Sequence, residues 1–216
     1  MTVPFTFSKA SCVAVGTFNI YIVQPPFLKE ANCVEVEEET WEVETDLSQP
    51  GFRYEFPQLH LKCAVRPDRF FVESENITVD CGSVVHNVIK ALKWTPLTAI
   101  GINASFTLKN KDEIREIERN HFPTLPEVDG AAIKHRMVHV SVVKDEQRYN
   151  LQLGVKDEVA EFAMNSHSQL EDSGGRKQAW DMAVELTQRF FTHRSIGTKL
   201  ATSLFGIRFD HVDYND

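Results

Sequence analysis

Apolar residues occupy every second position in three consecutive runs between Met137 and Asn165. The runs are Val138, Val140 and Val142, then Tyr149, Leu151, Leu153 and Val155, then Ala160, Phe162 and Met164. Because side chains on a strand point alternately to opposite faces, each run predicts a strand with one apolar and one polar face. The gaps between the runs are short and charged, which is typical of tight connections. The segment therefore predicts a three-stranded antiparallel meander.

A helical pattern follows the meander, with apolar residues three or four positions apart. These residues are Ala179, Ala183, Leu186 and Phe190. Their spacing predicts a helix over about 176–193 whose apolar side can cover the sheet. The tail over 195–216 still carries leucine and phenylalanine, and we expect it to dock against the rest of the chain.

The first half of the chain has a similar order of patterns. Residues 13–23 predict a long strand. A hairpin is predicted by the alternation over 59–65, the turn that follows it and the strand pattern over 70–74. A helix with an apolar stripe is expected to begin near Ser83, which is a favourable cap residue. Pro96 ends this segment, since the residue before a proline disfavours helical geometry.

The chain then returns to a strand pattern over 100–108. Asn110 with Glu113 has the spacing of a capping box and predicts a short helix over 111–121. Few residues of this helix are apolar, so we expect most of it to face solvent.

Together these elements predict an α+β protein with a mainly antiparallel curved sheet, or sheets, and two long covering helices. We treat 1–216 as one domain. The repeated order of strand, insertion, further strands and helix suggests two similar sheet-plus-helix halves, 1–96 and 97–216. Without internal sequence identity, a duplication is a hypothesis.

The composition of the chain limits the classes of protein to which it can belong. At 216 residues with 42% hydrophobic residues, the chain can bury a sizeable core. Its net charge of −8 makes nucleic acid an unlikely partner, because phosphate binding needs clustered Lys and Arg. No run of about 20 apolar residues is present, so we expect no membrane span. The N-terminus also lacks the pattern of a secretory signal.

The cysteines and histidines do not have the spacing of a metal site. Four widely spaced cysteines include no Cys-x-x-Cys pair, which fits a reduced, cytoplasmic protein. We expect the protein to be bacterial. His135 and His139 lie in a strand pattern, where four residues span roughly 13 Å, too far to share one ion. We predict no catalytic residue, no metal ligand and no cofactor.

One segment departs from the average composition. Residues 35–46 hold seven acidic residues and no basic residue, with Trp41 among them. One interpretation is a charged edge strand or flap that discourages pairing with other chains. The sharper interpretation is a docking surface for a basic partner with tryptophan as an anchor. A third, mimicry of nucleic-acid phosphates, fits less well because the rest of the chain is not acidic enough. The candidate partner-binding residues are Glu37, Glu38, Glu39, Trp41, Glu42 and Glu44.

Two functions of different classes remain open. The first is a non-catalytic interaction or accessory protein that acts through the acidic, aromatic-bearing flap or through a sheet edge, with a protein partner. Exposed sheet edges would also allow a homodimer. The alternative is a small-molecule binding protein or enzyme with a pocket between the curved sheet and a helix, since such pockets need no short motif.

Overall fold

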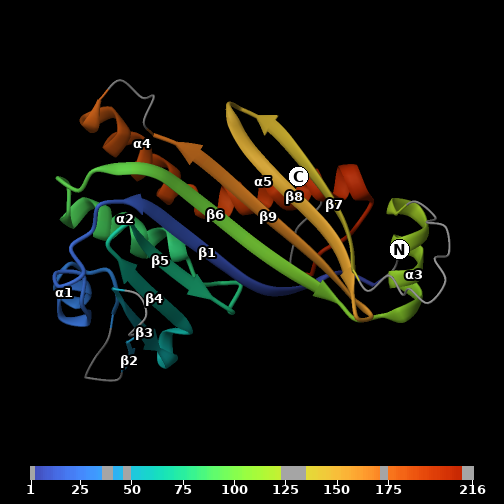
Figure 1. Cartoon of the computed structure of the whole chain (residues 1–216), viewed down its shortest axis with the longest axis horizontal. Coiled ribbons are helices and arrows are strands. Elements are labelled where there is room, and N and C mark those ends of the chain that lie inside the picture. Colours follow the sequence, from blue (N-terminus) through green and yellow to red (C-terminus); the bar gives the residue numbers. More distant parts are fainter. Residues whose placement is uncertain (1–2, 36–40, 46–49, 123–134, 171–174, 211–216) are drawn as a thin grey trace. The chain divides into compact units, whose positions relative to one another are not determined.

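The computed structural model describes residues 3–35, 41–45, 50–122, 135–170 and 175–210. Within these ranges, nine strands form one antiparallel sheet in the order β2-β3-β4-β5-β1-β6-β9-β8-β7 (Figure 1). The strands are β1 Thr6–Gly16, β2 Glu42–Glu44, β3 Phe52–Phe56, β4 Leu61–Arg66, β5 Arg69–Ser74, β6 Leu97–Leu108, β7 His135–Lys144, β8 Gln147–Lys156 and β9 Val159–Gln169. The helices are α1 Pro25–Glu30, η1 (a 3₁₀ turn) Pro57–Leu59, α2 Cys81–Ala91, α3 Lys111–His121, α4 Arg176–Gln188 and α5 Phe190–Phe205. The predicted α+β class with an antiparallel sheet is confirmed.

The chain packs as two compact units, each built from separate stretches. Unit 1 comprises Met1–Ser8, Ala104–Ser166 and Arg194–Asp216, and unit 2 comprises Lys9–Asn103 and His167–His193. These boundaries do not follow the halves 1–96 and 97–216, and the duplication stays a hypothesis. Five α-helices accompany the sheet in the described residues, where the sequence predicted two long ones.

The predicted meander is confirmed in unit 1 as β7, β8 and β9. Strands β7 and β8 pair over ten consecutive residues, from His135 opposite Lys156 to Lys144 opposite Gln147. The turns after β7 and β8 hold Asp145–Glu146 and Asp157–Glu158, and all four residues have positive φ. Positive φ at both central residues matches the right-handed twist of the flanking strands. The short charged gaps therefore make two-residue hairpins.

Phenylalanine rings fill the core of unit 1. Phe106 and Phe162 on neighbouring strands both contact Phe209, with ring centroids 4.7 and 5.1 Å away. Phe5 pairs with Phe209 through an isolated parallel bridge, which ties the two ends of the described chain to this core. Aromatic rings at these spacings combine large buried area with favourable ring geometry.

The prediction for α3 is confirmed. The side chain of Asn110 accepts hydrogen bonds from the backbone N–H groups of Asp112 and Glu113, each at 3.1 Å. Two donors at the start of the helix are thereby satisfied. Ile114 and Ile117 provide its buried side.

The single helix predicted over 176–193 is wrong, because two helices, α4 and α5, occupy 176–205. The tail that we expected to dock is largely helical. Its buried residues include Gly197 and Ala201, and a Cβ on Gly197 would collide with Met164. Small residues allow close packing but give a weak apolar signal, so the second helix was missed.

The strand predicted over 13–23 is also wrong, since β1 covers Thr6–Gly16. The chain turns away after Gly16, where the backbone of Pro96 comes too close for any Cβ. A turn follows in which Ile22 N–H donates to the carbonyl of Asn19. Apolar residues in this turn, including buried Phe18, imitate a strand pattern.

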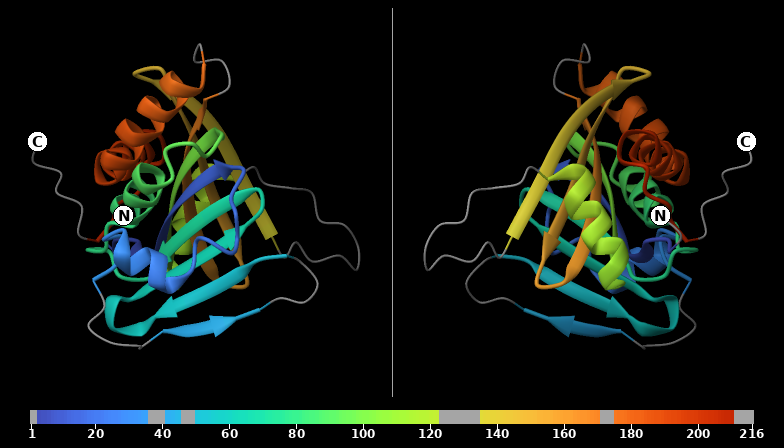
Figure 2. Two further views of the ribbon diagram at one scale, coloured as in Figure 1. Left: turned by 90° about the vertical axis from the view of Figure 1, so that its left-hand side faces the viewer. Right: turned by 90° about the vertical axis from the view of Figure 1, so that its right-hand side faces the viewer.

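In unit 2, the alternation along the strands separates two faces. On β4, Leu61, Cys63 and Val65 are buried, whereas the residues between them are half-buried. Helix α2 packs on β5 and against α4. Both views of Figure 2 place the short strand β2 at the outer edge of this part of the sheet, beyond β3.

Helix α2 begins two residues earlier than predicted, and Asp80 rather than Ser83 is its cap. The Asp80 carboxylate accepts a hydrogen bond from Ser83 N–H at 3.0 Å. Gly82, the second residue of α2, faces α4. A Cβ on Gly82 would collide with the carbonyl oxygen of Thr187 and with Phe190. The absence of a side chain therefore sets how closely α2 and α4 approach.

We expect Gly82→Ala to destabilise the protein by about 1–3 kcal/mol, because the added methyl group overpacks this contact. Chemical denaturation monitored by circular dichroism measures the change. Gly154→Ala is the matched control: its Cβ would lie 3.4 Å from the nearest atom, the carbonyl of Arg136. Equal effects of the two substitutions would contradict the role of Gly82.

Candidate functional site

The structure describes part of the acidic segment that the sequence singled out. Glu37, Glu38 and Glu39 lie outside the described residues. Trp41 is half-buried just before β2, and Glu42 and Glu44 are exposed on that strand. Strand β2 is an edge of the sheet, as the edge-strand interpretation expected.

The exposed strand β2 pairs with β3 on one side. Glu42 lies opposite Glu55, Val43 opposite Tyr54, and Glu44 opposite Arg53. The Val43 side chain is 53% exposed. An edge strand presents unpaired backbone groups to a partner chain, so β2 combines an open edge, two carboxylates and an exposed apolar side chain.

Charged side chains lie on the face of unit 2 that alternation places opposite the buried cysteines. One row across the strands holds Glu55, Lys62 and Glu73 in register. Lys62 Nζ lies 3.5 Å from the Glu55 carboxylate, and Lys9 Nζ lies 2.9 Å from that of Glu73. Lys62 and Lys9 together balance the charges of Glu55 and Glu73.

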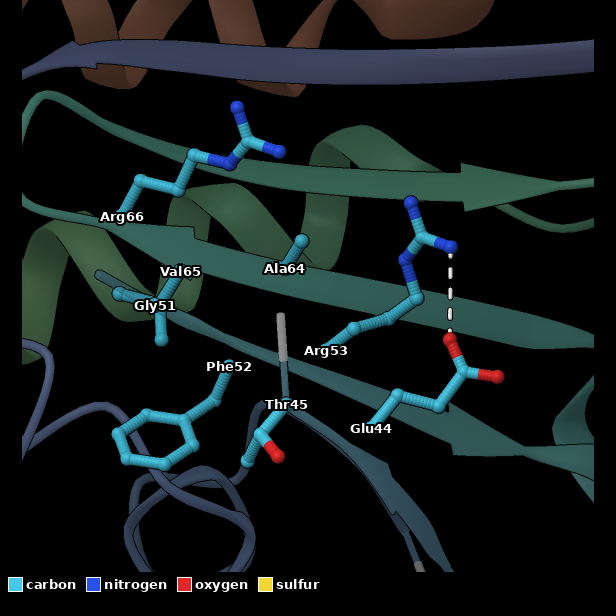
Figure 3. Close-up of a pocket in the computed structure, with 8 residues that line it drawn as sticks. All are labelled: Glu44, Thr45, Gly51, Phe52, Arg53, Ala64, Val65 and Arg66. Carbon is cyan, nitrogen blue, oxygen red and sulfur yellow. Dashed lines mark hydrogen bonds and ion pairs between the residues drawn. The ribbon is translucent and has the colours of Figure 1, made fainter. Parts of the chain in front are cut away.

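A hollow of about 390 Å³ lies beside this row, at the ends of β2, β3 and β4 (Figure 3). Its lining residues are Glu44, Thr45, Gly51, Phe52, Arg53, Ala64, Val65 and Arg66. In the close-up, the guanidinium groups of Arg53 and Arg66 extend in the same direction on either side of Ala64, while the Phe52 ring extends the opposite way (Figure 3). Of these residues, the sequence analysis had singled out only Glu44.

Carboxylates compensate two of the three arginines at this end of the face. Arg53 lies 3.5 Å from Glu44, with both side chains largely exposed. Arg69 donates from Nε to the carboxylate of Asp68 at 3.0 Å. The hydrogen bond from Arg69 lowers the pKa of Asp68, and the nearby charge of Arg66 adds to that effect. Arg66 makes no ion pair or side-chain hydrogen bond with any residue in the described ranges.

The four cysteines, far apart in sequence, all lie buried in unit 2 as free thiols. Burial raises the pKa of Cys12 and Cys63 well above the ordinary value and raises that of Cys33 to about 12. The Cys81 thiol contacts the carbonyl oxygen of Ala10 at 3.7 Å. Because the thiolate is the reactive form, Cys12, Cys33 and Cys63 behave as core residues rather than nucleophiles.

The second edge of the sheet is β7, in unit 1. It is ten residues long, and its pairing with β8 runs without interruption. Met137 and Val143 on its outer positions are 52% and 67% exposed. Proteins usually protect edges with short strands, charges, proline or bulges, and β7 has a long, regular and partly apolar edge.

Neither the family models nor the curated proteins compared with this chain match it. Within the described residues, no group of three or more His, Cys, Asp or Glu side chains is placed to hold a metal ion. No helix in those residues is long and apolar enough to cross a membrane.

His86 is a buried histidine in the α2–α4 contact. Its Nδ1 lies 3.2 Å from the carbonyl oxygen of Val184 and 3.3 Å from the hydroxyl of Thr187. A carbonyl only accepts, so Nδ1 carries the proton and donates to Val184. Burial lowers the pKa of His86 below its ordinary value of 6.5, and the charge of Lys90 adds to this. The histidine is therefore neutral and serves packing.

The lowered pKa predicts how stability depends on pH. The unfolded chain takes up a proton on His86 more readily than the folded chain, so acid favours unfolding. The free energy of unfolding should therefore be highest above a pH of about 6.5 and should decrease as the pH falls below that value. His193, whose pKa burial also lowers, contributes in the same direction. Denaturant titrations between pH of about 7.5 and 5.5 should give a smaller pH dependence for His86→Asn; an unchanged dependence would contradict this assignment.

Proposed function

We propose that this chain is a non-catalytic interaction protein that binds an extended, basic segment of another protein along β2. The proposal rests on one observation: the acidic segment and an open sheet edge coincide in the described strand Glu42–Glu44. The two surfaces that the sequence offered as alternatives are thus one surface.

Even an edge strand as short as β2 can bind a partner by strand addition. A partner strand gains backbone hydrogen bonds from the edge, while pockets and charges for alternate side chains select its sequence. Glu42 and Glu44 project to one face and would select basic residues at alternate positions. Val43 projects to the other face, and the half-buried Trp41 lies two residues before it, so both can contact apolar residues of the partner.

The acidic side chains mainly contribute selectivity and speed of association. Each exposed ion pair contributes little to affinity, and salt screens it. Complementary charge still directs encounter and suppresses wrong partners. A partner at β2 is therefore expected to bind more weakly as ionic strength rises. The four free, buried cysteines support a reducing compartment such as the cytoplasm as the place of this activity.

A photo-crosslinking amino acid at position 43 tests the proposal. In an extract of the native organism, we expect the Val43 variant to crosslink to a basic segment of a partner. Glu42→Gln combined with Glu44→Gln should weaken binding of that partner by about fivefold to tenfold, because two ion pairs are lost.

The same amino acid at Trp94, an apolar position in the same unit that is 83% exposed, is the matched control. The same products from both positions would contradict binding at β2. So would a partner whose affinity is the same for the wild-type protein and the double glutamine variant.

We also propose that a second copy of the chain pairs along β7. Two β7 strands can pair antiparallel about a two-fold axis with Val140 opposite its own copy. This register places Met137 opposite Val143 and Ser141 opposite His139. It covers both exposed apolar side chains and continues the sheet, which is a closed, isologous contact.

Val143→Lys should shift the protein toward the monomer, because it places a charge beside Met137 of the second copy. Light scattering during size-exclusion chromatography measures the mass against 24.6 kDa for one chain. Tyr21→Lys, an equally drastic change on another exposed apolar residue, should leave the mass unchanged. A wild-type mass of one chain at high concentration would refute the dimer.

A further inference from the structure

The charges beside the hollow at the ends of β2, β3 and β4 destabilise the folded chain when no ligand is bound. In the pairing of β4 with β5, Arg66 lies directly opposite Arg69. Like charges at opposed positions destabilise a sheet. Asp68, in the turn between these strands, bonds to Arg69 and is near enough for the charge of Arg66 to lower its pKa, but Arg66 makes no direct ion pair with a carboxylate of the described residues. Local rules are most often broken in this way at functional sites.

Gly51 leaves room for the side chain of Arg66 at the hollow. Gly51 has φ of +153°, which residues with a side chain rarely adopt. A Cβ at this position would lie 2.5 Å from the carbonyl oxygen of Val65 and 3.1 Å from Cγ of Arg66. The stem of Arg66 therefore rests against the bare backbone at Gly51, and a larger residue there would displace it.

Arg53 is placed to share a ligand with Arg66. Arg53 lies opposite Ala64 in the pairing of β3 with β4, and Ala64 and Arg66 are two residues apart on the same face of β4. The methyl group of Ala64 leaves the space between the two guanidinium groups open (Figure 3). Within the described ranges, Arg53 forms an ion pair with Glu44 at 3.5 Å, and exposed pairs at that distance exchange readily.

The lining indicates the chemistry of the ligand. Guanidinium groups present paired N–H donors that match the oxygens of a carboxylate or a phosphate. Among the described lining residues, Arg53 and Arg66 face a single carboxylate, Glu44, which leaves an excess of one positive charge in that part of the chain. The volume of the hollow is at the lower end of the range for small-molecule sites, and larger than one oxyanion needs. Ala64, on the same face of β4 as Arg66, offers apolar contact for the remainder of a ligand.

We propose that this hollow is a binding site for a small organic oxyanion, held between Arg66 and Arg53, with Glu44 as an internal competitor for Arg53. Ligand binding releases Arg53 from Glu44 and supplies the negative charge that Arg66 lacks. Anion binding at this site does not require a protein partner at β2. The site differs in place from the pocket between sheet and helix that the sequence suggested, because the described residues that line it lie on β2, β3 and β4 or directly beside these strands.

Titration of the isotope-labelled protein with phenyl phosphate and with benzoate, followed by ¹H–¹⁵N NMR, tests the site. We expect saturable shifts of the Gly51 and Ala64 amides with at least one anion and no such saturation with benzyl alcohol, the uncharged control. Arg66→Gln should weaken binding by about tenfold or more, since a charged hydrogen-bond donor is lost. Arg66→Lys, which keeps the charge but not the fork, should lie in between.

Two further variants separate this site from general electrostatics and from the β2 surface. Arg115→Gln removes an exposed arginine on α3, paired with Asp112 at 3.5 Å, and should leave binding unchanged. Glu44→Gln should tighten anion binding by about twofold to fivefold, because Arg53 loses its competing carboxylate. The same substitution should weaken a basic partner at β2, so the two proposals can fail separately.

The outcomes assign the ligand or refute the site. Tighter binding of phenyl phosphate supports a phosphate-bearing ligand, and tighter binding of benzoate supports a carboxylate. No saturable binding of either anion to the wild-type protein would overturn the proposal. Equal binding by Arg66→Gln, in a protein whose other amide shifts are unchanged, would overturn it as well.

Discussion

The alternation of side chains along β3, β4, β5 and β1, locked in a continuous antiparallel register, determines the rest of unit 2. Cys63 on β4 lies opposite Val72 on β5, which lies opposite Cys12 on β1, and all three are fully buried. The same register places lysine, glutamate and arginine on the other face. A slip of one residue would exchange the two faces and bury the charges, so burial of one face fixes the other.

That register also arranges the charges of the outer face. Around Lys62, opposite charges stand next to each other and neutralise one another. Around Arg66, positive charges gather and one lacks a partner in the described residues. Glu44 belongs to both candidate surfaces, since it projects from the open strand β2 and holds Arg53 at the hollow. An anion in the hollow would release Glu44 from Arg53 and leave that carboxylate available to a basic partner on β2, so the two ligands would favour each other's binding.

Regular local patterns were predicted well. The meander follows from strict alternation, and α3 follows from a cap residue at the correct spacing. The failures have equally physical causes. Strand β1 was misplaced because a turn containing Phe18 is as apolar as a strand and because Gly16 ends β1 by its contact with Pro96. Helix α5 was missed because small residues such as Gly197 form its buried side.

The sequence by itself determined the antiparallel α+β class, the acidic strand near Trp41 and the two-residue hairpins, since each depends on residues close together in the chain. Only the tertiary structure decided that Glu44 lies opposite Arg53, and that Arg53 and Arg66 stand on either side of Ala64. Those relations join different strands, and their spacing depends on cross-strand register and on the passage of a bare glycine backbone under Arg66. Periodicity along one strand carries no information about which residue of another strand lies opposite.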